Sequence, residues 1–254
     1  MLSTPGRPLL SASRVSYSYP GAKNAAPVLE DFSLSVNEGE FFCLLGPSGC
    51  GKTSILNLLA GFTQPDAGTI SLGGQAVSRA DADRGVVFQN EDALFPWLNA
   101  LQNVSFGLRM KGMDAAQTET VARRFIDAVH LTGHEKKFPG EMSGGMKQRV
   151  QIARVLANDP KILLMDEPFG AVDAQTRTSL QDELAQIWEA DRKTVLFITH
   201  DISEAILLAD RIGIVSKGPR SHLLQVLDND LPRPRRRSSP RFGELWEEIN
   251  ALLH

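Results

Sequence analysis

The chain has 254 residues, of which 42% are hydrophobic and 22% charged, and its formal net charge is −3. A chain of this length can bury a sizeable core in one large domain or two small ones. The net charge argues against a nucleic-acid partner bound through its phosphate backbone. No apolar stretch reaches the roughly 18 residues that a membrane-crossing helix needs. The two cysteines, Cys43 and Cys50, fit no metal or redox spacing, and we expect the chain in the reducing cytoplasm.

The first ninety residues contain several short segments with β patterns. Alternation of apolar and polar residues, as at Leu29, Phe32, Leu34 and Val36, predicts strands of a half-buried sheet. A uniformly apolar run predicts a strand that is covered on both faces. The predicted strands are 12–20, 27–36, 41–45, 68–72 and 84–89.

The second half of the chain adds helices and then two buried strands. From about residue 90 to 159 the pattern is helical, and Asp114 can cap one of these helices. Buried strands return at 161–166 and 194–199, separated by a helix with one apolar face. Alternating strands and helices predict an α/β fold, with a mostly parallel sheet and a helical insert at about 90–159.

A glycine-rich turn follows the apolar strand at 41–45. Its sequence GPSGCGKT fits the phosphate-loop pattern G-x-x-x-x-G-K-[ST], and it opens a predicted helix. Curled backbone N–H groups and a helix N-terminus attract phosphate, Lys52 adds a full charge, and the Thr53 hydroxyl can bind Mg²⁺. A plain glycine turn with a solvated lysine is the alternative. The residues expected at the nucleotide are Gly46, Pro47, Ser48, Gly49, Cys50, Gly51, Lys52, Thr53 and Ser54.

Two acidic residues stand at the end of the strand 161–166. A carboxylate at Asp166 can hold Mg²⁺ through water, and Glu167 is placed to polarise an attacking water. An ordinary strand end followed by a turn would explain the same residues. The phosphate loop elsewhere in the chain favours the functional interpretation.

Three more features extend this pattern. Ser143, Gly144 and Gly145 precede a helix and form a second possible anion site, which suggests that it serves the nucleotide of a neighbouring chain. Gln89 follows a strand, where its amide could reach the metal or the water. His200 follows the strand 194–199, where its imidazole could contact a γ-phosphate. Taken singly, these are an ordinary helix cap and two loop residues.

The order of these features resembles that of the ATP-binding subunits of ATP-binding-cassette (ABC) transporters, over about residues 10–217. The resemblance implies the ABC ATPase fold in a single domain, with an N-terminal antiparallel part, the helical subdomain at 90–159 and a short tail at about 229–254. It implies ATP and Mg²⁺ as cofactors, with Thr53, Gln89 and Asp166 at the metal.

The resemblance also implies roles for single residues. Glu167 corresponds to the catalytic glutamate, assisted by His200 and Gln89, and Asp173 corresponds to the D-loop aspartate. Tyr19 best matches the residue that stacks on adenine, with Tyr17 as the alternative. The segment MSGGM departs from the family pattern, because Met142 replaces leucine and Met146 replaces glutamine.

The same resemblance implies partners. Two copies would pack head to tail, each completing the other's ATP site through Ser143, Gly144 and Gly145. The homodimer would sit at the cytoplasmic face of the inner membrane, bound to transmembrane permease subunits that work with a solute-binding protein. The apolar segment 95–98 predicts a permease contact, because exposed apolar patches mark partner sites. Burial of Trp97 within the helical insert is the alternative.

The motif sequences are similar to the branch that imports taurine, aliphatic sulfonates or nitrate, and RGVVFQNE leans toward taurine. Nitrate import is the nearest alternative. A non-transport ABC ATPase and a P-loop kinase are the alternatives of another class; MSGGM speaks against the kinase.

The C-terminal segment carries an apolar stripe and a basic run. The stripe predicts a helix that docks on the domain, and the four arginines predict a solvated linker, with anionic lipid headgroups as the alternative partner. The stripe comprises Phe242, Leu245, Trp246, Ile249 and Leu252, and the arginines are Arg233, Arg235, Arg236 and Arg237.

Overall fold

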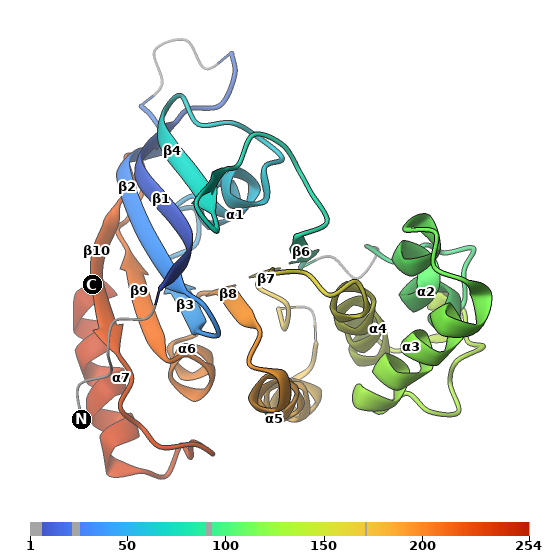
Figure 1. The fold of residues 1–254 in the computed structure, drawn as a ribbon. Helices are drawn as coiled ribbons and strands as arrows, with labels where there is room; N and C mark the ends of the chain where they lie inside the picture. The colour runs from blue at the N-terminus through green and yellow to red at the C-terminus, as the bar shows by residue number, and fades with distance from the viewer. Residues whose placement is uncertain (1–6, 22–25, 90–92, 171, 254) are drawn as a thin grey trace. The chain divides into compact units, whose positions relative to one another are not determined.

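The computed structural model describes residues 7–21, 26–89, 93–170 and 172–253. The chain divides into two compact units, formed by residues 1–81 with 192–254 and by residues 82–191 (Figure 1). No helix within the described ranges is long and apolar enough to cross a membrane.

The first unit contains a four-stranded antiparallel sheet with the order β2-β1-β4-β5. Leu29, Phe32, Leu34 and Val36 are buried, as their alternation predicts. The three-residue step from Leu29 to Phe32 spans Asp31, whose φ of 51° lies in the left-handed region where the register with β1 shifts. The strands are β1 (Pro8–Tyr17), β2 (Leu29–Asn37), β4 (Ala67–Leu72) and β5 (Gln75–Ala76).

The first unit also contains the strands that lead into the phosphate loop. β3 pairs in parallel with β8 and with β9, and β10 pairs antiparallel with β9. Every residue of β3 and β8 is buried, as expected for strands covered on both faces. These strands are β3 (Phe41–Leu45), β8 (Thr194–Thr199), β9 (Arg211–Val215) and β10 (Leu223–Asp228); the helices are α1 (Lys52–Ala60), α6 (Ile202–Leu208) and α7 (Pro240–Leu253).

The second unit joins a parallel strand pair to a group of helices. β6 pairs with β7, and α4 packs against β6, α2, α3 and α5. A Cβ on Gly85 would lie 2.3 Å from Val155, so the glycine lets α4 approach β6 closely. Asp114 caps α3, as predicted. The elements are β6 (Arg84–Val87), α2 (Ala100–Met110), α3 (Ala115–Ala128), a 3₁₀ turn (Pro139–Glu141), α4 (Gly144–Ala157), β7 (Ile162–Asp166) and α5 (Ala174–Asp191).

The antiparallel sheet, the parallel strands and the helices of the second unit agree with the fold class expected from the sequence. The helical insert was expected to start at about residue 90, which lies outside the described residues. The second unit holds β6, β7 and α5 in addition to the expected helices.

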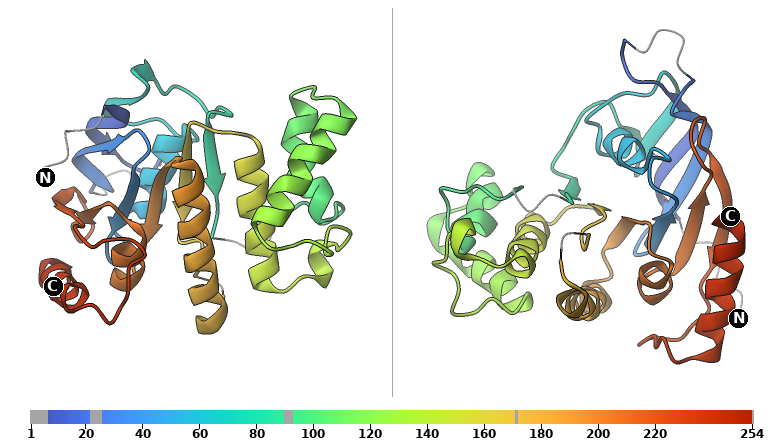
Figure 2. Two further views of the ribbon diagram at one scale, coloured as in Figure 1. Left: turned by 60° about the horizontal axis from the view of Figure 1, so that its bottom comes forward. Right: turned by 180° about the vertical axis from the view of Figure 1, so that it is seen from behind.

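The C-terminal tail is packed onto the first unit. α7 contacts α6 and β9, and it buries Phe242, Leu245 and Ile249, which confirms the docked helix (Figure 2). The prediction of a solvated basic linker is wrong for Arg233 and Arg235, whose side chains are only 14% and 3% exposed. Both guanidinium groups donate to backbone carbonyls and lie beside the carboxylate of Asp210. Arg236 and Arg237 are exposed.

Candidate active site

The phosphate loop turns from β3 into α1 with glycines at the positions that need them. Gly49 and Gly51 have φ values of 80° and 87°, which residues with a side chain rarely adopt. Gly51 is the N-cap of α1 and has no side chain with which to cap the first turn. The Lys52 side chain is held within the loop, because its Nζ donates to the carbonyls of Gly46 at 2.8 Å and Pro47 at 3.1 Å. The result is a preformed cradle with one ammonium group and an open helix N-terminus.

Close packing surrounds this cradle. A Cβ on Gly51 would lie 2.7 Å from Cγ1 of Val28, and one on Gly46 would lie 2.9 Å from Sγ of Cys50. Cys50 is only 1% exposed, so its side chain packs inside the fold and does not face a ligand. Ser48 and Thr53 are exposed on the outer side of the loop and at the start of α1.

An exposed tyrosine is tethered to the first turn of α1. The hydroxyl of Tyr19 lies 2.7 Å from Oγ of Ser54, and Tyr19 as a residue is 57% exposed. Tyr17 is only 6% exposed and packs edge-on against Tyr19, with 5.5 Å between ring centroids. Only Tyr19 of these two therefore has a ring face that can receive a planar ligand.

His200 stands exposed between β8 and α6. The Thr199 hydroxyl donates to Oε2 of Glu204 at 2.6 Å and accepts from the backbone N–H of Asp201 at 3.0 Å. Asp201 is the N-cap of α6. Sequence reasoning missed Glu204, although an aspartate followed three residues later by glutamate is the pattern of a helix start.

In the second unit, the parallel pairing of β6 and β7 brings Gln89 beside the acidic turn. Asp166 ends β7 and is 7% exposed, and Glu167 follows with a φ of 42°. A Cβ on Gly170 would lie 3.1 Å from Nε2 of Gln89 and 3.3 Å from the carbonyl oxygen of Glu167. A non-glycine residue in the left-handed region stores strain, which is common at functional sites.

Ser143 begins α4, where its Oγ accepts from the backbone N–H of Met146 at 3.3 Å. A Cβ on Gly145 would lie 2.5 Å from Cγ2 of Thr176, so this glycine allows close contact with the start of α5. Met142 is 8% exposed, which shows that methionine fills an apolar position there. Ser143 itself is exposed, as an anion site at this helix end requires.

The carboxylate of Asp173 caps α5. Its Oδ1 accepts from the backbone N–H groups of Gln175 at 3.1 Å and Thr176 at 3.0 Å. Hydrogen bonds from Thr176 lower the pKa of Asp173, so the group is ionised at neutral pH. The cap of α5 therefore explains an aspartate at position 173 within the single chain.

The predicted residues fall into two sets. The first unit holds Tyr19, the loop from Gly46 to Ser54, and His200. The second unit holds the rest of the set, which comprises Gln89, Ser143, Gly144, Gly145, Asp166, Glu167 and Asp173. The structure brings Gln89 together with the Asp166–Gly170 turn, and Tyr19 together with the phosphate-loop helix.

Residues 29–170 match the family model described as ABC transporter. A taurine import ATP-binding protein of Pseudomonas savastanoi pv. phaseolicola is 46% identical over 96% of this chain and 95% of its own length. A bicarbonate transport ATP-binding protein of Synechocystis is 47% identical over 90% of this chain and 81% of its own. A nitrate import ATP-binding protein of Synechococcus elongatus is 43% identical over 94% of this chain and 89% of its own.

Among solved structures, the chain resembles the ATP-binding cassette MJ0796, described as dimeric in a post-hydrolysis state bound to ADP and Pi. That likeness has a TM-score of 0.74 and 28% identity, and it covers 89% of this chain and 99% of that one. It supports the fold class expected from the sequence.

Proposed function

Because this chain belongs to the ABC transporter family, whose ATP-binding proteins hydrolyse ATP, we propose that it powers the import of a small anionic or zwitterionic solute. Taurine or an aliphatic sulfonate is the first candidate for that solute, and nitrate is the second. Three relatives of similar identity are named for taurine, bicarbonate and nitrate. These solutes share a small oxyanion group, and the proposal commits to that chemical class.

The preformed phosphate loop is the observation that carries this proposal. Lys52 is already held over the loop, and the N-cap residue of α1 is a glycine, which has no side chain to displace. A triphosphate would therefore gain backbone hydrogen bonds, a full charge and the helix dipole with little rearrangement. Stacking of adenine on the exposed ring of Tyr19 would complete nucleotide recognition.

The remaining site residues divide the hydrolysis step among them. Mg²⁺, when bound, would neutralise phosphate charge, and Thr53, Gln89 and Asp166 would hold it. Thr53 fits that role because its hydroxyl is at the exposed start of α1. Glu167 would accept a proton from the attacking water, and His200 would contact the γ-phosphate.

We also propose that two copies of the chain share each nucleotide. Ser143 is exposed at the start of α4, where backbone N–H groups and the helix dipole can receive phosphate. The solved relative MJ0796 is dimeric in its ADP-bound structure. In this arrangement Ser143, Gly144 and Gly145 of one protomer would close over the phosphate loop of its partner.

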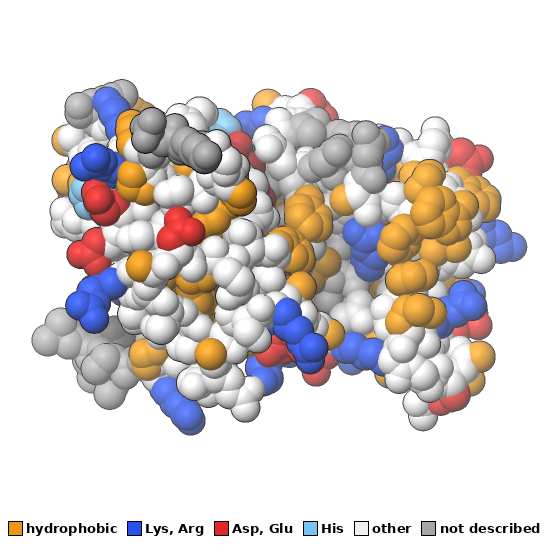
Figure 3. Space-filling model, turned by 90° about the horizontal axis from the view of Figure 1, so that it is seen from above, with side chains coloured by type: hydrophobic (Ala, Val, Ile, Leu, Met, Phe, Trp, Pro, Cys, Tyr) orange, Lys and Arg blue, Asp and Glu red, His pale blue; other side chains and the backbone are white. Residues whose placement is uncertain are grey.

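An aromatic platform on the second unit supports docking to a permease. We use this name for residues 93–98, which carry Trp97 with 69% of its surface exposed. The exposure overturns the alternative of a core tryptophan. Phe95 lies 5.6 Å from Trp97 and 4.6 Å from Phe106, measured between ring centroids. Hydrophobic side chains gather over the helices of this unit in Figure 3.

The aromatic platform is rigidly built. Asn103, which is 0% exposed, donates from Nδ2 to the carbonyls of Phe95 at 3.2 Å and Leu98 at 2.8 Å and accepts from the Phe95 N–H at 2.9 Å. Arg154 donates to the carbonyl of Ala93 at 2.9 Å and covers the Phe95 ring at 5.2 Å. A cavity of about 300 Å³ adjoins Phe95, Phe106 and Arg154. A preformed aromatic anchor beside a hollow suits a protein partner.

The partner that we propose is a transmembrane permease, which works with a solute-binding protein on the far side of the membrane. The chain would then be peripheral, at the cytoplasmic face of the inner membrane. The experiment reconstitutes the chain with its permease and binding protein in proteoliposomes. ATP hydrolysis and uptake are measured with taurine, an alkanesulfonate, nitrate and bicarbonate.

We expect taurine or the alkanesulfonate to stimulate both hydrolysis and uptake. Stimulation by nitrate or bicarbonate alone would replace the first candidate with that solute. Failure of the chain to associate with any permease would contradict the transport role.

A further inference from the structure

The short helix α6 follows His200 in the chain, and Asp201 is the N-cap of this helix. With seven residues, Ile202–Leu208, it is far below the length at which a helix is stable alone. The last carbonyls of any helix lack partners inside the helix. The groups that bind the two ends of α6 therefore decide whether it forms and where it lies.

The N-terminal end of α6 is joined to both neighbours of His200. Oδ1 of Asp201 accepts from the backbone N–H groups of Ser203 at 2.7 Å and Glu204 at 3.3 Å. On the other side, Thr199 donates to the Glu204 carboxylate at 2.6 Å, and both side chains are at least 96% buried. His200 thus stands between two residues that are bonded to the first turn of α6.

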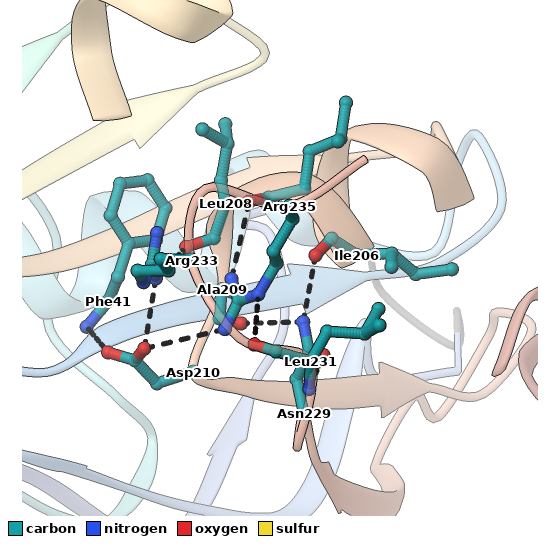
Figure 4. Close-up of polar contacts among 10 residues, drawn as sticks. Phe41, Ile206, Leu208, Ala209, Asp210, Asn229, Leu231, Arg233 and Arg235 are labelled. Carbon is teal, nitrogen blue, oxygen red and sulfur yellow. Dashed lines mark hydrogen bonds and ion pairs between the residues drawn. The ribbon is translucent and has the colours of Figure 1, made fainter. Parts of the chain in front are cut away.

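The C-terminal end of α6 is capped by side chains from the tail. Three tail residues, Asn229, Arg233 and Arg235, donate to backbone carbonyls at this end, and we call these three residues the tail clamp (Figure 4). The carbonyls that accept are those of Ile206, Leu207, Leu208 and Ala209. Asn229 Nδ2 donates to the carbonyls of Ile206 at 2.8 Å and Ala209 at 2.9 Å, Arg235 Nη1 to that of Leu207 at 3.2 Å, and Arg233 Nη2 to that of Leu208.

Charge strengthens the tail clamp. Two guanidinium groups lie at the helix end where the dipole is negative. Asp210 accepts from Arg233 at 2.9 Å, lies 3.6 Å from Arg235, and accepts from the backbone N–H of Phe41 at 3.1 Å. Phe41 is the first residue of β3, the strand that ends at the phosphate loop. The clamp therefore joins α6 to that strand.

We propose that the tail clamp positions His200 for hydrolysis by fixing α6 from its C-terminal end. The proposal rests on the role assigned to His200 in the proposed function. Arg233 and Arg235 are positioning residues, because they act on the imidazole through α6 and touch no reacting atom. A tail that served only to stabilise the fold would leave the ring of His200 unchanged in variants that remain folded.

The test compares Arg235→Ala with Arg236→Ala in the full chain. Arg236 is the matched control, because it is the adjacent arginine and is exposed. The ring signals of the five histidines are recorded by NMR, and the His200 signal is assigned from a His200→Ala variant. The kcat and the Kd for ATP are measured separately, at a temperature well below the melting point of each variant.

We expect Arg235→Ala to shift or broaden the His200 signal while the signal of His134, in the other unit, stays in place. The kcat should fall about tenfold with Kd for ATP changed by less than about twofold, because misplacing a reacting group acts on the transition state. Arg235→Lys should recover part of the loss, since lysine donates to carbonyls without the forked geometry. Arg236→Ala should behave as the unaltered chain.

An unchanged His200 signal and kcat in folded Arg235→Ala would overturn the proposal. Should Arg235→Ala fail to fold, Arg233→Ala decides the same question, because it removes one helix carbonyl contact and the ion pair with Asp210. If the unaltered chain neither binds nor hydrolyses ATP, the proposed function fails. The His200 ring signal still decides in that case whether the clamp positions the imidazole.

Discussion

The hydroxyl of Tyr19 lies 2.7 Å from Oγ of Ser54, so the exposed ring ahead of the phosphate loop is held by the helix that follows the loop. This hydrogen bond joins two residues that are 35 positions apart. It fixes where a planar ligand would stack relative to the phosphate cradle.

Two substitutions of Tyr19 should therefore weaken ATP binding to different extents. Tyr19→Ala removes the ring and should raise the Kd for ATP about fivefold or more, since stacking a base on an aromatic ring contributes about 1–3 kcal/mol. Tyr19→Phe keeps the ring and loses the tether, so a smaller increase is expected. Titration with a fluorescent ATP analogue measures both.

Tyr17→Phe is the control, because Tyr17 is buried beside Tyr19. It should leave the Kd unchanged. A larger effect at Tyr17 than at Tyr19 would reverse the assignment of the stacking residue.

The local parts of this site could be predicted from the sequence. A phosphate loop is a contiguous pattern between a strand and a helix, and the apolar runs at β3, β7 and β8 mark buried strands without knowledge of their neighbours. The position of Gln89 beside the turn after Asp166 depends on the parallel pairing of β6 with β7, which was not predicted.

The contacts that side chains make with backbone carbonyls could not be predicted. Arg233 and Arg235 look like a solvated basic run because the carbonyls that they bind lie 25 and 28 residues earlier. Asn103 looks like an ordinary helix residue until its amide is seen to hold the turn at Phe95 and Leu98. These carbonyl partners are backbone groups, which carry no signal in the sequence.

The exposed Trp97 should contribute to assembly with the permease and not to the stability of the fold. Trp97→Ala should change the melting temperature of the isolated chain by little, because 69% of the residue is already exposed. Its affinity for the permease should fall at least tenfold, since truncating a buried interface anchor costs about 2 kcal/mol or more. A thermal melt and a pull-down with the permease measure the two effects.

Phe138→Ala is the matched control, because Phe138 is 44% exposed in the same unit and outside the aromatic platform. Its affinity for the permease should equal that of the unaltered chain. Equal losses in the two variants would count against a specific anchor at Trp97.

Asn103→Ala should lower both the stability of the fold and the affinity for the permease. It removes the buried Asn103 amide that donates to the carbonyl of Leu98 and accepts from the N–H of Phe95, which costs about 1–3 kcal/mol of unfolding free energy. Loss of the rigid platform should also weaken permease binding at temperatures where the variant is folded. Urea unfolding and the same pull-down measure these losses, and full permease affinity in the folded variant would show that the platform needs no such support.

Ser143 should act on the nucleotide of the partner protomer. Ser143→Asp keeps the helix cap, because aspartate and serine are comparable N-caps, and it sets a negative charge against phosphate. Neither Ser143→Asp nor Lys52→Ala should hydrolyse ATP alone. A mixture of the two places both lesions in one shared site and leaves the other site intact, so part of the activity should return. Heterodimers that form and stay inactive would argue that each chain closes its own site.

We propose that Glu167 activates water for ATP hydrolysis in a complex that drives solute import. The direct measurement compares the unaltered chain with Glu167→Gln, each reconstituted with permease and solute-binding protein. Glutamine has the shape of glutamate and can occupy the same left-handed backbone position, while it removes the proton acceptor. We expect Glu167→Gln to bind ATP with unchanged affinity, to accumulate as an ATP-bound dimer and to abolish hydrolysis and uptake together. Hydrolysis near the unaltered rate in Glu167→Gln would rule out this role of Glu167.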